Sequence, residues 1–130
     1  MTFPNMTKDS IKVYIASPYT LGNKISNVNR QIDTAHILMN LNFVPFVPLL
    51  NHFQNVVQPR PDNDWITIDN IWLLVCDCVL RLSGESVGAD DEVALAKKHN
   101  IPVFYSLGEL CNYYEKETIN GSDYSFEIGV

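Results

Sequence analysis

The chain has 130 residues, of which 46% are hydrophobic and 18% charged, so it has room for one domain with one core and not for several. Its net charge of −6, with only nine scattered Lys and Arg, argues against a nucleic-acid polymer as partner, because such binding depends on clustered positive charge. No apolar run reaches the roughly 20 residues of a membrane helix, and the N-terminus lacks the pattern of a signal peptide. We therefore expect a cytoplasmic protein without membrane contact.

The sequence contains three cysteines, Cys76, Cys78 and Cys111. An odd count without a disulfide framework is typical of proteins from the reducing cytosol. Cys76 and Cys78 have the spacing of half a metal site, but no second pair of Cys or His follows them. We therefore expect buried free thiols and no bound metal.

The first part of the chain is predicted to form two strands with a helix between them. Residues 11–16 and 43–48 are short apolar runs of the kind found in buried strands, and Pro45 favours the edge of a sheet for the second run. Between them, apolar residues recur at steps of four and three, which predicts one face of an amphipathic helix. These residues are Leu21, Ile25, Val28, Ile32, Ala35 and Met39. Ser26 or Asn27 is the expected N-cap of this helix.

The second part of the chain alternates helices and strands after a predicted loop. Residues 49–62 have no clear period and contain two prolines, which indicates a long loop, a kind of segment that often carries function. The elements predicted after it are a helix over 63–76, a strand over 77–82, a helix over 88–100, a strand over 101–106 and a helix over 107–116.

This alternation predicts a single α/β domain over residues 1–130, with a parallel sheet covered by helices on both faces. Ligands of such sheets bind beyond the carboxyl ends of the strands. The segments that meet that edge are residues 16–24, 48–62 and 83–92. None of them carries a P-loop, a dinucleotide-binding glycine motif or a G-x-S-x-G elbow. His36 and His99 are interpreted as structural, and the role of His52 is left open.

The segment 83–96, SGESVGADDEVALA, places four acidic residues between a predicted strand and a predicted helix. We expect the helix to begin at Ala89 or Asp90, so that Glu92 lies in its first turn near the carboxyl edge of the sheet. There the positive end of the helix dipole favours the ionised carboxylate, which is the form that a nucleophile at a sugar carbon needs. In the alternative interpretation, Asp90 caps the helix and the other acids only suit the dipole.

Three stretches of the sequence resemble one known family. They are KVYIASPY at 12–19, TIDNIWLLVCDCVL at 67–80 and SVGADDEVALA at 86–96. In this order and spacing they are similar to the nucleoside 2-deoxyribosyltransferase superfamily, which includes the 2′-deoxynucleoside 5′-monophosphate N-hydrolases. The resemblance covers residues 11–105. It implies a flavodoxin-like α/β sandwich with a four- or five-stranded parallel sheet, and cleavage of the bond between a sugar C1′ and a nucleobase.

The resemblance also implies roles for individual residues. Glu92 matches the glutamate that attacks C1′ and forms a glycosyl ester. Asp69 matches an aspartate that assists near the leaving base, and Tyr14 matches a first-strand tyrosine that contacts the nucleophile region. The chemistry is like glycoside hydrolysis, in which one carboxylate traps an oxocarbenium-like sugar and a second group supplies a proton. Asp77, which heads a strand, is interpreted as structural.

The residue six positions before the nucleophile separates the subfamilies, and here it is Ser86. The monophosphate hydrolases have serine there, whereas transferases of free nucleosides tend to have a carboxylate, which would repel a phosphate. Ser17 is expected to supply a second hydroxyl, and Pro18 and Gly88 complete the predicted substrate-binding residues. Lys24 is the cation that the first loop offers.

These observations predict an N-glycosidase that acts on a nucleoside 5′-monophosphate, with water as the acceptor. One alternative is a nucleoside 2-deoxyribosyltransferase that exchanges bases on free deoxynucleosides, and another is a non-catalytic nucleotide-binding module. No organic cofactor or metal is expected, since carboxylates and water suffice for the chemistry. The resembling family often builds its site at a subunit interface, so we expect a homo-oligomer. Its contact is expected at aromatic residues near the C-terminus, Tyr113, Tyr114, Tyr124 and Phe126.

Overall fold

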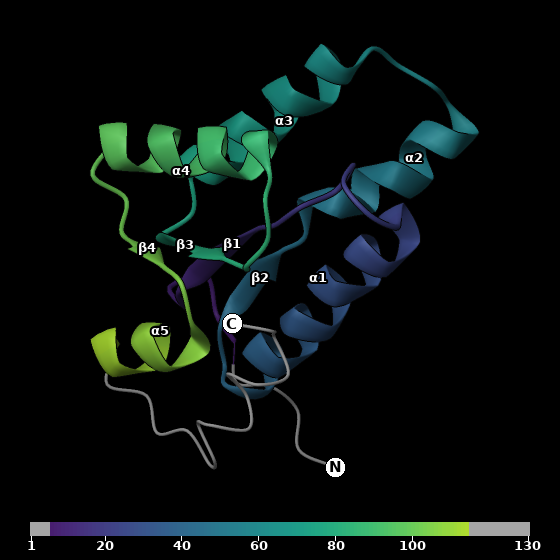
Figure 1. Ribbon diagram of the computed structural model, residues 1–130. Helices are drawn as coiled ribbons and strands as arrows, with labels where there is room; N and C mark the ends of the chain where they lie inside the picture. The colour runs from purple at the N-terminus through teal and green to yellow at the C-terminus, as the bar shows by residue number, and fades with distance from the viewer. Residues whose placement is uncertain (1–5, 115–130) are drawn as a thin grey trace.

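The computed structural model describes residues 6–114 and shows an α/β fold of three layers (Figure 1). Its sheet has four parallel strands in the order β2-β1-β3-β4, which confirms the predicted parallel sheet of a flavodoxin-like fold. The strands are β1 (Lys12–Ala16), β2 (Val44–Phe46), β3 (Cys78–Arg81) and β4 (Val103–Phe104). β2 lies at the edge of the sheet, as Pro45 predicts.

Helices cover both faces of this sheet. They are α1 (Lys24–Asn40), the short 3-10 helix η1 (Pro48–Leu50), α2 (Asn51–Val57), α3 (Asp62–Leu74), α4 (Val87–Lys98) and α5 (Leu107–Tyr113). α1 and α5 lie on one side of the sheet, and α3 and α4 lie on the other (Figure 1). No helix within residues 6–114 is long and apolar enough to cross a membrane.

Side chains of the central strand alternate between the two faces, as the two-residue period of a strand requires. Val13 and Ile15 of β1 face the core formed with α1 and α5. Tyr14 and Ala16 face the core under α3 and α4. β1 and β3 are neighbours at the centre of the sheet, and the chain continues from β1 to β2 on one side and from β3 to β4 on the other, so its course diverges between these two strands. Ligands of doubly wound sheets bind at such a divergence.

The predicted caps of the first helix are wrong. α1 is capped by Asn23, whose side chain accepts a hydrogen bond of 2.9 Å from the Ser26 N–H. Asn27 lies within the helix and donates to two backbone carbonyls of the preceding loop. The loop is therefore folded back on the helix start, and Leu21 and Ile25 are exposed rather than part of the buried face.

The long loop predicted over residues 49–62 is also wrong, because η1 and α2 fill most of it. Leu50, Phe53 and Val57 recur at steps of three and four, which is a helical period. Pro48 begins the helical run, a position at which proline is well tolerated. The period is hard to recognise because α2 is short and buries none of its residues.

α4 begins earlier than its acidic residues suggest. Ser86 is its N-cap, with Oγ accepting a hydrogen bond of 3.0 Å from the Ala89 N–H, and Val87 is the first helical residue. The predicted start at Ala89 or Asp90 is therefore wrong, as is the alternative in which Asp90 caps the helix. Glu92 is the sixth residue of α4 and lies in its second turn.

The three cysteines are free thiols, as the sequence predicts. Cys78 and Cys111 are buried, and Cys76 is partly buried. Burial raises the pKa of Cys76 to about 11 and that of Cys78 to about 12. Both thiols are therefore protonated and poorly nucleophilic near neutral pH.

Candidate active site

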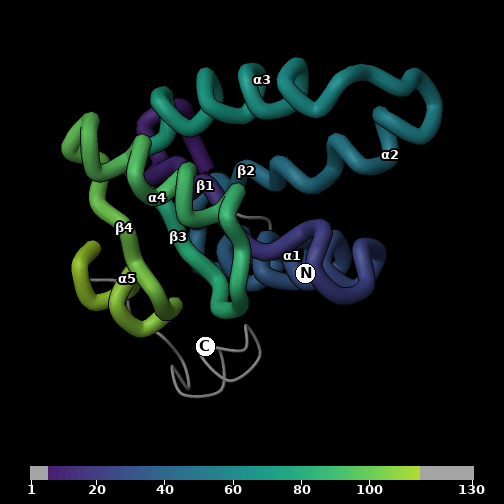
Figure 2. Tube along the Cα trace, turned by 45° about the horizontal axis from the view of Figure 1, so that its top comes forward, coloured from purple at the N-terminus to yellow at the C-terminus, as the bar shows by residue number. Residues whose placement is uncertain are grey.

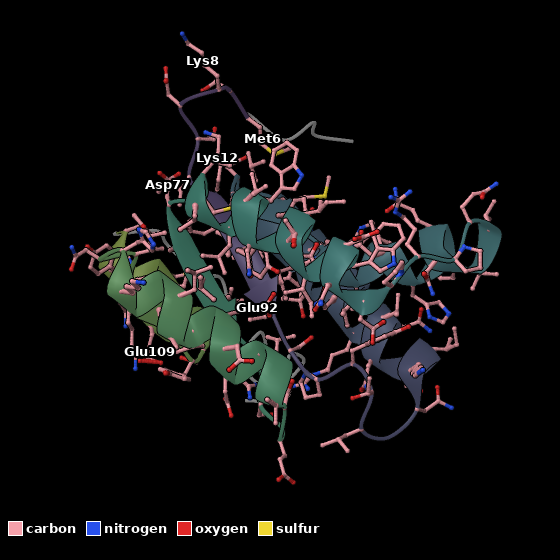
Figure 3. All side chains as sticks on the ribbon, turned by 90° about the horizontal axis from the view of Figure 1, so that it is seen from above. Met6, Lys8, Lys12, Asp77, Glu92 and Glu109 are labelled. Atoms are coloured by element: carbon pink, nitrogen blue, oxygen red, sulfur yellow. The ribbon has the colours of Figure 1, made fainter. Side chains whose placement is uncertain are left out.

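A tyrosine and a glutamate meet between the sheet and the layer formed by α3 and α4. Tyr14 is buried in β1 with its ring on the α4 side. Glu92 projects from the second turn of α4, and Figure 3 shows it between α4 and α3. The Tyr14 hydroxyl donates a hydrogen bond to Oε2 of Glu92. The fold therefore joins two candidate residues that are 78 positions apart in the sequence.

Burial raises the pKa of the Glu92 carboxyl to about 7. The hydrogen bond from Tyr14 opposes this rise, and the negative charge of Asp69 adds to it. Arg81 lowers the pKa to a smaller extent, and Asp91 raises it. The prediction that the helix dipole favours the ionised form is wrong, because Glu92 lies beyond the first turn, where the dipole is strongest. Burial decides the direction instead.

Replacing Glu92 by glutamine is expected to stabilise the fold above neutral pH. The carboxyl has a pKa of about 7 in the folded protein against an ordinary value of 4.5, so the folded state binds more protons between these pH values. The free energy of unfolding of the wild type therefore falls as the pH rises through this range. We expect Glu92→Gln to be more stable by about 3 kcal/mol at pH 8 and equally stable at pH 4, measured by urea denaturation. Equal stability at both pH values would contradict the burial of this carboxylate.

Asp69 approaches the same place from α3. Its Oδ1 accepts a hydrogen bond of 2.7 Å from Nδ2 of Asn51, the first residue of α2. Burial raises the pKa of Asp69 to about 6, and the bond from Asn51 partly offsets this effect. The charge of Asp69 raises the pKa of both Glu92 and Tyr14, so the three groups interact electrostatically.

Tyr14 is a fixed hydrogen-bond donor. Burial, followed by the negative charges of Glu92 and Asp69, raises the pKa of its phenol far above the ordinary value, so it stays protonated. Its ring stacks on Phe46, with 5.6 Å between ring centroids, and Phe46 stacks on Trp72 at 5.5 Å. This aromatic column fixes the position of the tyrosine and thereby of the carboxylate that it binds.

The site thus combines two carboxyl groups that titrate near neutrality with one fixed donor. The pKa values of Asp69 and Glu92 are about 6 and about 7, so between these pH values the pair holds roughly one proton. The order of the two values places this proton more often on Glu92, and the form with ionised Glu92 and protonated Asp69 is the minor one. An ionised carboxylate is a nucleophile, and a protonated one is a general acid. The arrangement is suited to a reaction that needs both at once.

The loops after β1 and β3 lie against each other at the carboxyl edge of the sheet. Gly84 has a φ of +118°, and a Cβ there would lie 2.7 Å from Cγ of Pro18, so the position requires glycine. Ser86 uses its Oγ lone pair to cap α4, which leaves its hydroxyl hydrogen available to a ligand. Gly88 is an exposed residue of the first turn of α4. Three predicted substrate-binding residues, Pro18, Ser86 and Gly88, therefore share this edge.

Ser17 is 6% exposed, and its Oγ accepts a hydrogen bond of 2.8 Å from Nε2 of Gln31. The same nitrogen donates to the carbonyl of Ile15, so Gln31 ties the end of β1 to α1. Ser17 follows the last residue of β1, and its hydroxyl takes part in this buried polar link on the α1 side, so its contact with a substrate stays a prediction.

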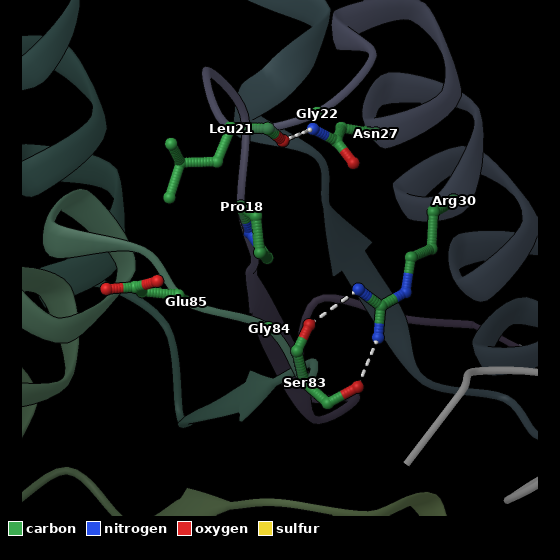
Figure 4. Close-up of a pocket in the computed structure, with 8 residues that line it drawn as sticks. All are labelled: Pro18, Leu21, Gly22, Asn27, Arg30, Ser83, Gly84 and Glu85. Carbon is green, nitrogen blue, oxygen red and sulfur yellow. Dashed lines mark hydrogen bonds between the residues drawn. The ribbon is translucent and has the colours of Figure 1, made fainter.

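An open cavity of about 460 Å³ lies beside this edge (Figure 4). Its lining comprises Pro18, Leu21 and Gly22 of the first loop, Asn27 and Arg30 of α1, and residues 83–85. None of Tyr14, Asp69 and Glu92 lines it, so it borders the acidic site without containing it. The candidate site therefore consists of Tyr14, Asp69 and Glu92, which provide the reactive groups, and the cavity lies next to it.

Three residues around the site were not predicted: Asn51, Arg30 and Arg81. Asn51 lies in the segment interpreted as a loop, and the helical period of that segment is the signal that would have placed it. Arg81 ends a strand that is otherwise apolar, and a charge in such a strand signals a buried partner. Next to Asn51, Nδ1 of His52 lies 2.6 Å from the Tyr19 hydroxyl and joins α2 to the first loop.

Among the residues interpreted as structural, Asp77 makes a structural contact, and the interpretation of His36, which is exposed on α1, and of His99 stays a prediction. Oδ2 of Asp77 accepts a hydrogen bond of 2.8 Å from the Lys12 N–H, which ties the starts of β1 and β3 together. Figure 3 shows Asp77 beside Lys12 and away from Glu92. His99 follows the last residue of α4 and donates its backbone N–H to carbonyls of that helix.

A family comparison covers the whole sheet and the candidate site. No curated protein matches the chain. The family described as "Domain of unknown function (DUF7768)" matches residues 11–106, a span that contains all four strands and Tyr14, Asp69 and Glu92. The protein is therefore a member of the DUF7768 family.

Proposed function

We propose that this protein cleaves the N-glycosidic bond of a nucleoside 5′-monophosphate and transfers the sugar to water. The observation that carries the proposal is the hydrogen bond between Tyr14 and Glu92 beside Asp69, next to the loops where ligands of doubly wound sheets bind. The resemblance to the nucleoside 2-deoxyribosyltransferase superfamily supports it, since the same three residues match the catalytic positions of that family.

In the proposed reaction the ionised Glu92 attacks C1′ of the sugar. A bond forms between C1′ and a Glu92 oxygen while the bond from C1′ to the base nitrogen breaks and its electron pair leaves with the base. Asp69 donates a proton to the departing base. A water molecule then attacks C1′, Asp69 takes up its proton, and the ester bond to Glu92 breaks. Tyr14 holds the attacking carboxylate through its hydroxyl.

The 5′-phosphate is proposed to bind at the start of α4. Ser86 offers a hydroxyl hydrogen, and the N–H of Gly88 has no partner within the helix because it belongs to the first turn. The helix dipole favours an anion at this end. The acidic neighbour Asp90 forms an ion pair of 3.1 Å with Arg81, which offsets its repulsion of a phosphate.

Replacing Gly88 by alanine is expected to weaken phosphate binding without weakening the fold. Alanine is favoured over glycine in helices, and the nearest atom that a Cβ at this position would meet is Ser86 Oγ at 4.0 Å. A phosphate that approaches the backbone here would clash with the added methyl group. We expect an unchanged or higher melting temperature and a KM for the monophosphate that rises about tenfold, with a smaller change for a free nucleoside. An unchanged KM would place the phosphate elsewhere.

Two other functions give different results in the same assay. A base-release assay with dAMP or dCMP, followed by one with deoxyinosine and free adenine, separates them. The proposal predicts release of base from the monophosphates and no exchange of base on the nucleoside. Exchange without hydrolysis would establish a deoxyribosyltransferase instead. Tight nucleotide binding without any turnover would establish a binding module, and it would contradict the proposed role of Glu92.

We also propose that the protein forms a homo-oligomer through α2 and α3. These helices extend beyond the sheet, as Figures 1 and 2 show, and expose large apolar side chains. The exposed residues include Phe53, Val56, Val57, Ile66, Ile71 and Trp72. This number of exposed large apolar side chains on two successive helices favours an interaction site over a free surface.

The C-terminal contact predicted from the sequence has less support. The Tyr114 ring packs on Phe43 and Phe104 within the same chain. Tyr113 is exposed but lies against Tyr114, at 4.8 Å between ring centroids. Tyr124 and Phe126 lie outside the described residues.

Replacing Ile71 by glutamate is expected to give a monomer. Ile71 and Tyr113 are both 61% exposed, so Tyr113→Glu is a matched control for the rival surface. A buried unpaired carboxylate at the α3 face would oppose association, whereas the same charge on α5 would not. Light scattering after gel filtration should show an oligomer for the wild type and Tyr113→Glu, and a monomer for Ile71→Glu. The reverse pattern, or a monomeric wild type, would contradict the proposed interface.

A further inference from the structure

Two arginines hold the turn that leads from β3 to α4. Arg81 donates to the carbonyl of Leu82 and, at 2.8 Å, to the carbonyl of Gly84. Arg30 donates at 2.6 Å to the carbonyl of Ser83 and at 2.9 Å to its Oγ. Figure 4 shows the Arg30 guanidinium directed at Ser83 from α1. Three consecutive carbonyls are thus bound from two sides of the sheet.

Arg81 also contacts a residue outside the turn. Its side chain lies on the same face of the sheet as Tyr14, because Arg81 pairs with Ala16 in the register of β1 and β3 and side chains alternate along a strand. The residue is 8% exposed, and its Nη2 also lies 3.1 Å from Oδ1 of Asp90. Asp90 precedes Glu92 by two residues on α4. A buried guanidinium therefore joins the end of β3, the turn and the first turns of α4.

We infer that Arg81 is a positioning residue for Glu92, and that it holds the start of α4 so that the Glu92 carboxylate meets the Tyr14 hydroxyl. Arg30 holds the same turn from the α1 side. The inference rests on the proposed role of Glu92 as nucleophile. A buried charge such as Arg81 needs partners, and the partners that it has are the backbone and side chain that set the course of α4.

Arg81 also acts on the charge of Glu92. The groups that face Glu92 are Tyr14 from β1, Asp69 from α3, Arg81 from β3 and Asp91 from α4 itself. Arg81 is the cation among these four, and it lowers the pKa of the carboxyl. Its removal should therefore raise that pKa, and the pH at which half of the enzyme carries an ionised nucleophile should rise with it.

The test compares Arg81→Met, Arg81→Lys and Asp90→Asn with the control Arg60→Met. Arg60 lies between α2 and α3 and forms a surface ion pair of 3.0 Å with Asp64. Arg81→Met should lower kcat about a hundredfold, a loss typical of a displaced reacting group, with a smaller change in KM. It should also shift the acidic limb of the pH profile upward. Arg81→Lys should keep the acidic limb of the pH profile near its wild-type position, because the positive charge remains. It should not restore kcat, because lysine lacks the planar guanidinium that donates to several acceptors at once. Asp90→Asn should lower kcat without an upward shift of the acidic limb of the pH profile.

A second measurement does not depend on turnover. The pKa of Glu92 can be followed by NMR of the labelled carboxyl carbon, in the wild type and in Arg81→Lys, Asp90→Asn and Arg81→Met, if the last folds. A wild-type protein without activity would refute the proposed function. The NMR titration of the Glu92 carboxyl would still show whether Arg81 acts on Glu92. If kcat and the Glu92 pKa of the Arg81 variants equal those of Arg60→Met, Arg81 does not position Glu92 and the inference is overturned.

Discussion

Glu92→Gln is expected to lower the rate of base release from a nucleoside 5′-monophosphate by at least about a thousandfold. Glutamine keeps the size of the side chain and can still accept the hydrogen bond from Tyr14, but its amide oxygen is a poor nucleophile. The variant should remain folded, since burial already disfavours the ionised carboxylate. Base release measured by chromatography in single-turnover conditions gives the rate of the chemical step directly.

A matched control is available on the opposite layer. Glu109 is exposed on α5, and Glu109→Gln makes the same chemical change away from the site (Figure 3). This control should release base at the wild-type rate. Comparable activity of Glu92→Gln and Glu109→Gln would remove Glu92 from the mechanism. Loss of activity together with loss of secondary structure in Glu92→Gln would contradict the expectation that this carboxylate destabilises the fold.

Asp69→Asn is expected to lower base release by about a hundredfold to ten-thousandfold for natural bases, since proton transfer to the leaving group contributes this much. Asparagine keeps an Oδ1 that can accept the 2.7 Å hydrogen bond from Asn51, so the local structure should be retained. What the variant loses is the proton that a carboxyl with a pKa of about 6 can deliver.

Substrates with different leaving groups distinguish a role of Asp69 as general acid from a structural role. A substrate whose leaving group departs without protonation should react with Asp69→Asn at nearly the wild-type rate. Asp64→Asn, in the first turn of the same helix, serves as the control and should be active on both substrates. An equal loss of rate on both substrates would show that Asp69 orients Glu92 or the substrate and does not supply the proton.

The layered fold could be predicted because its signals are local. Short apolar runs such as residues 11–16 and the positions of Pro45 and the prolines after α2 follow from backbone chemistry alone. The sequence does not reveal α2 because its apolar side chains are not buried, so no buried face marks it. The start of α4 lies before the position that its acidic residues suggest, because the hydroxyl of Ser86 caps the helix.

The site could be predicted only where residue type identifies a chemical role. Tyr14, Asp69 and Glu92 were named through their resemblance to a family, whereas Asn51, Arg30 and Arg81 depend on contacts between distant segments. The protonation behaviour of Glu92 could not be predicted either, because it follows from burial under α3 and α4, which the sequence does not reveal. The hydrogen bond between Ser17 and Gln31 could not be predicted for the same reason, since it is a property of the folded chain.

The central claim is that Glu92 forms a covalent bond with the sugar, and intact-protein mass spectrometry tests it most directly. The protein is mixed with dAMP and quenched in acid within one turnover, its intact mass is measured, and any adduct is then located by peptide mapping. The proposed mechanism predicts an added deoxyribose 5′-phosphate group on the peptide that contains Glu92, absent from Glu92→Gln. Base release without any adduct, or an adduct on another residue, would contradict it.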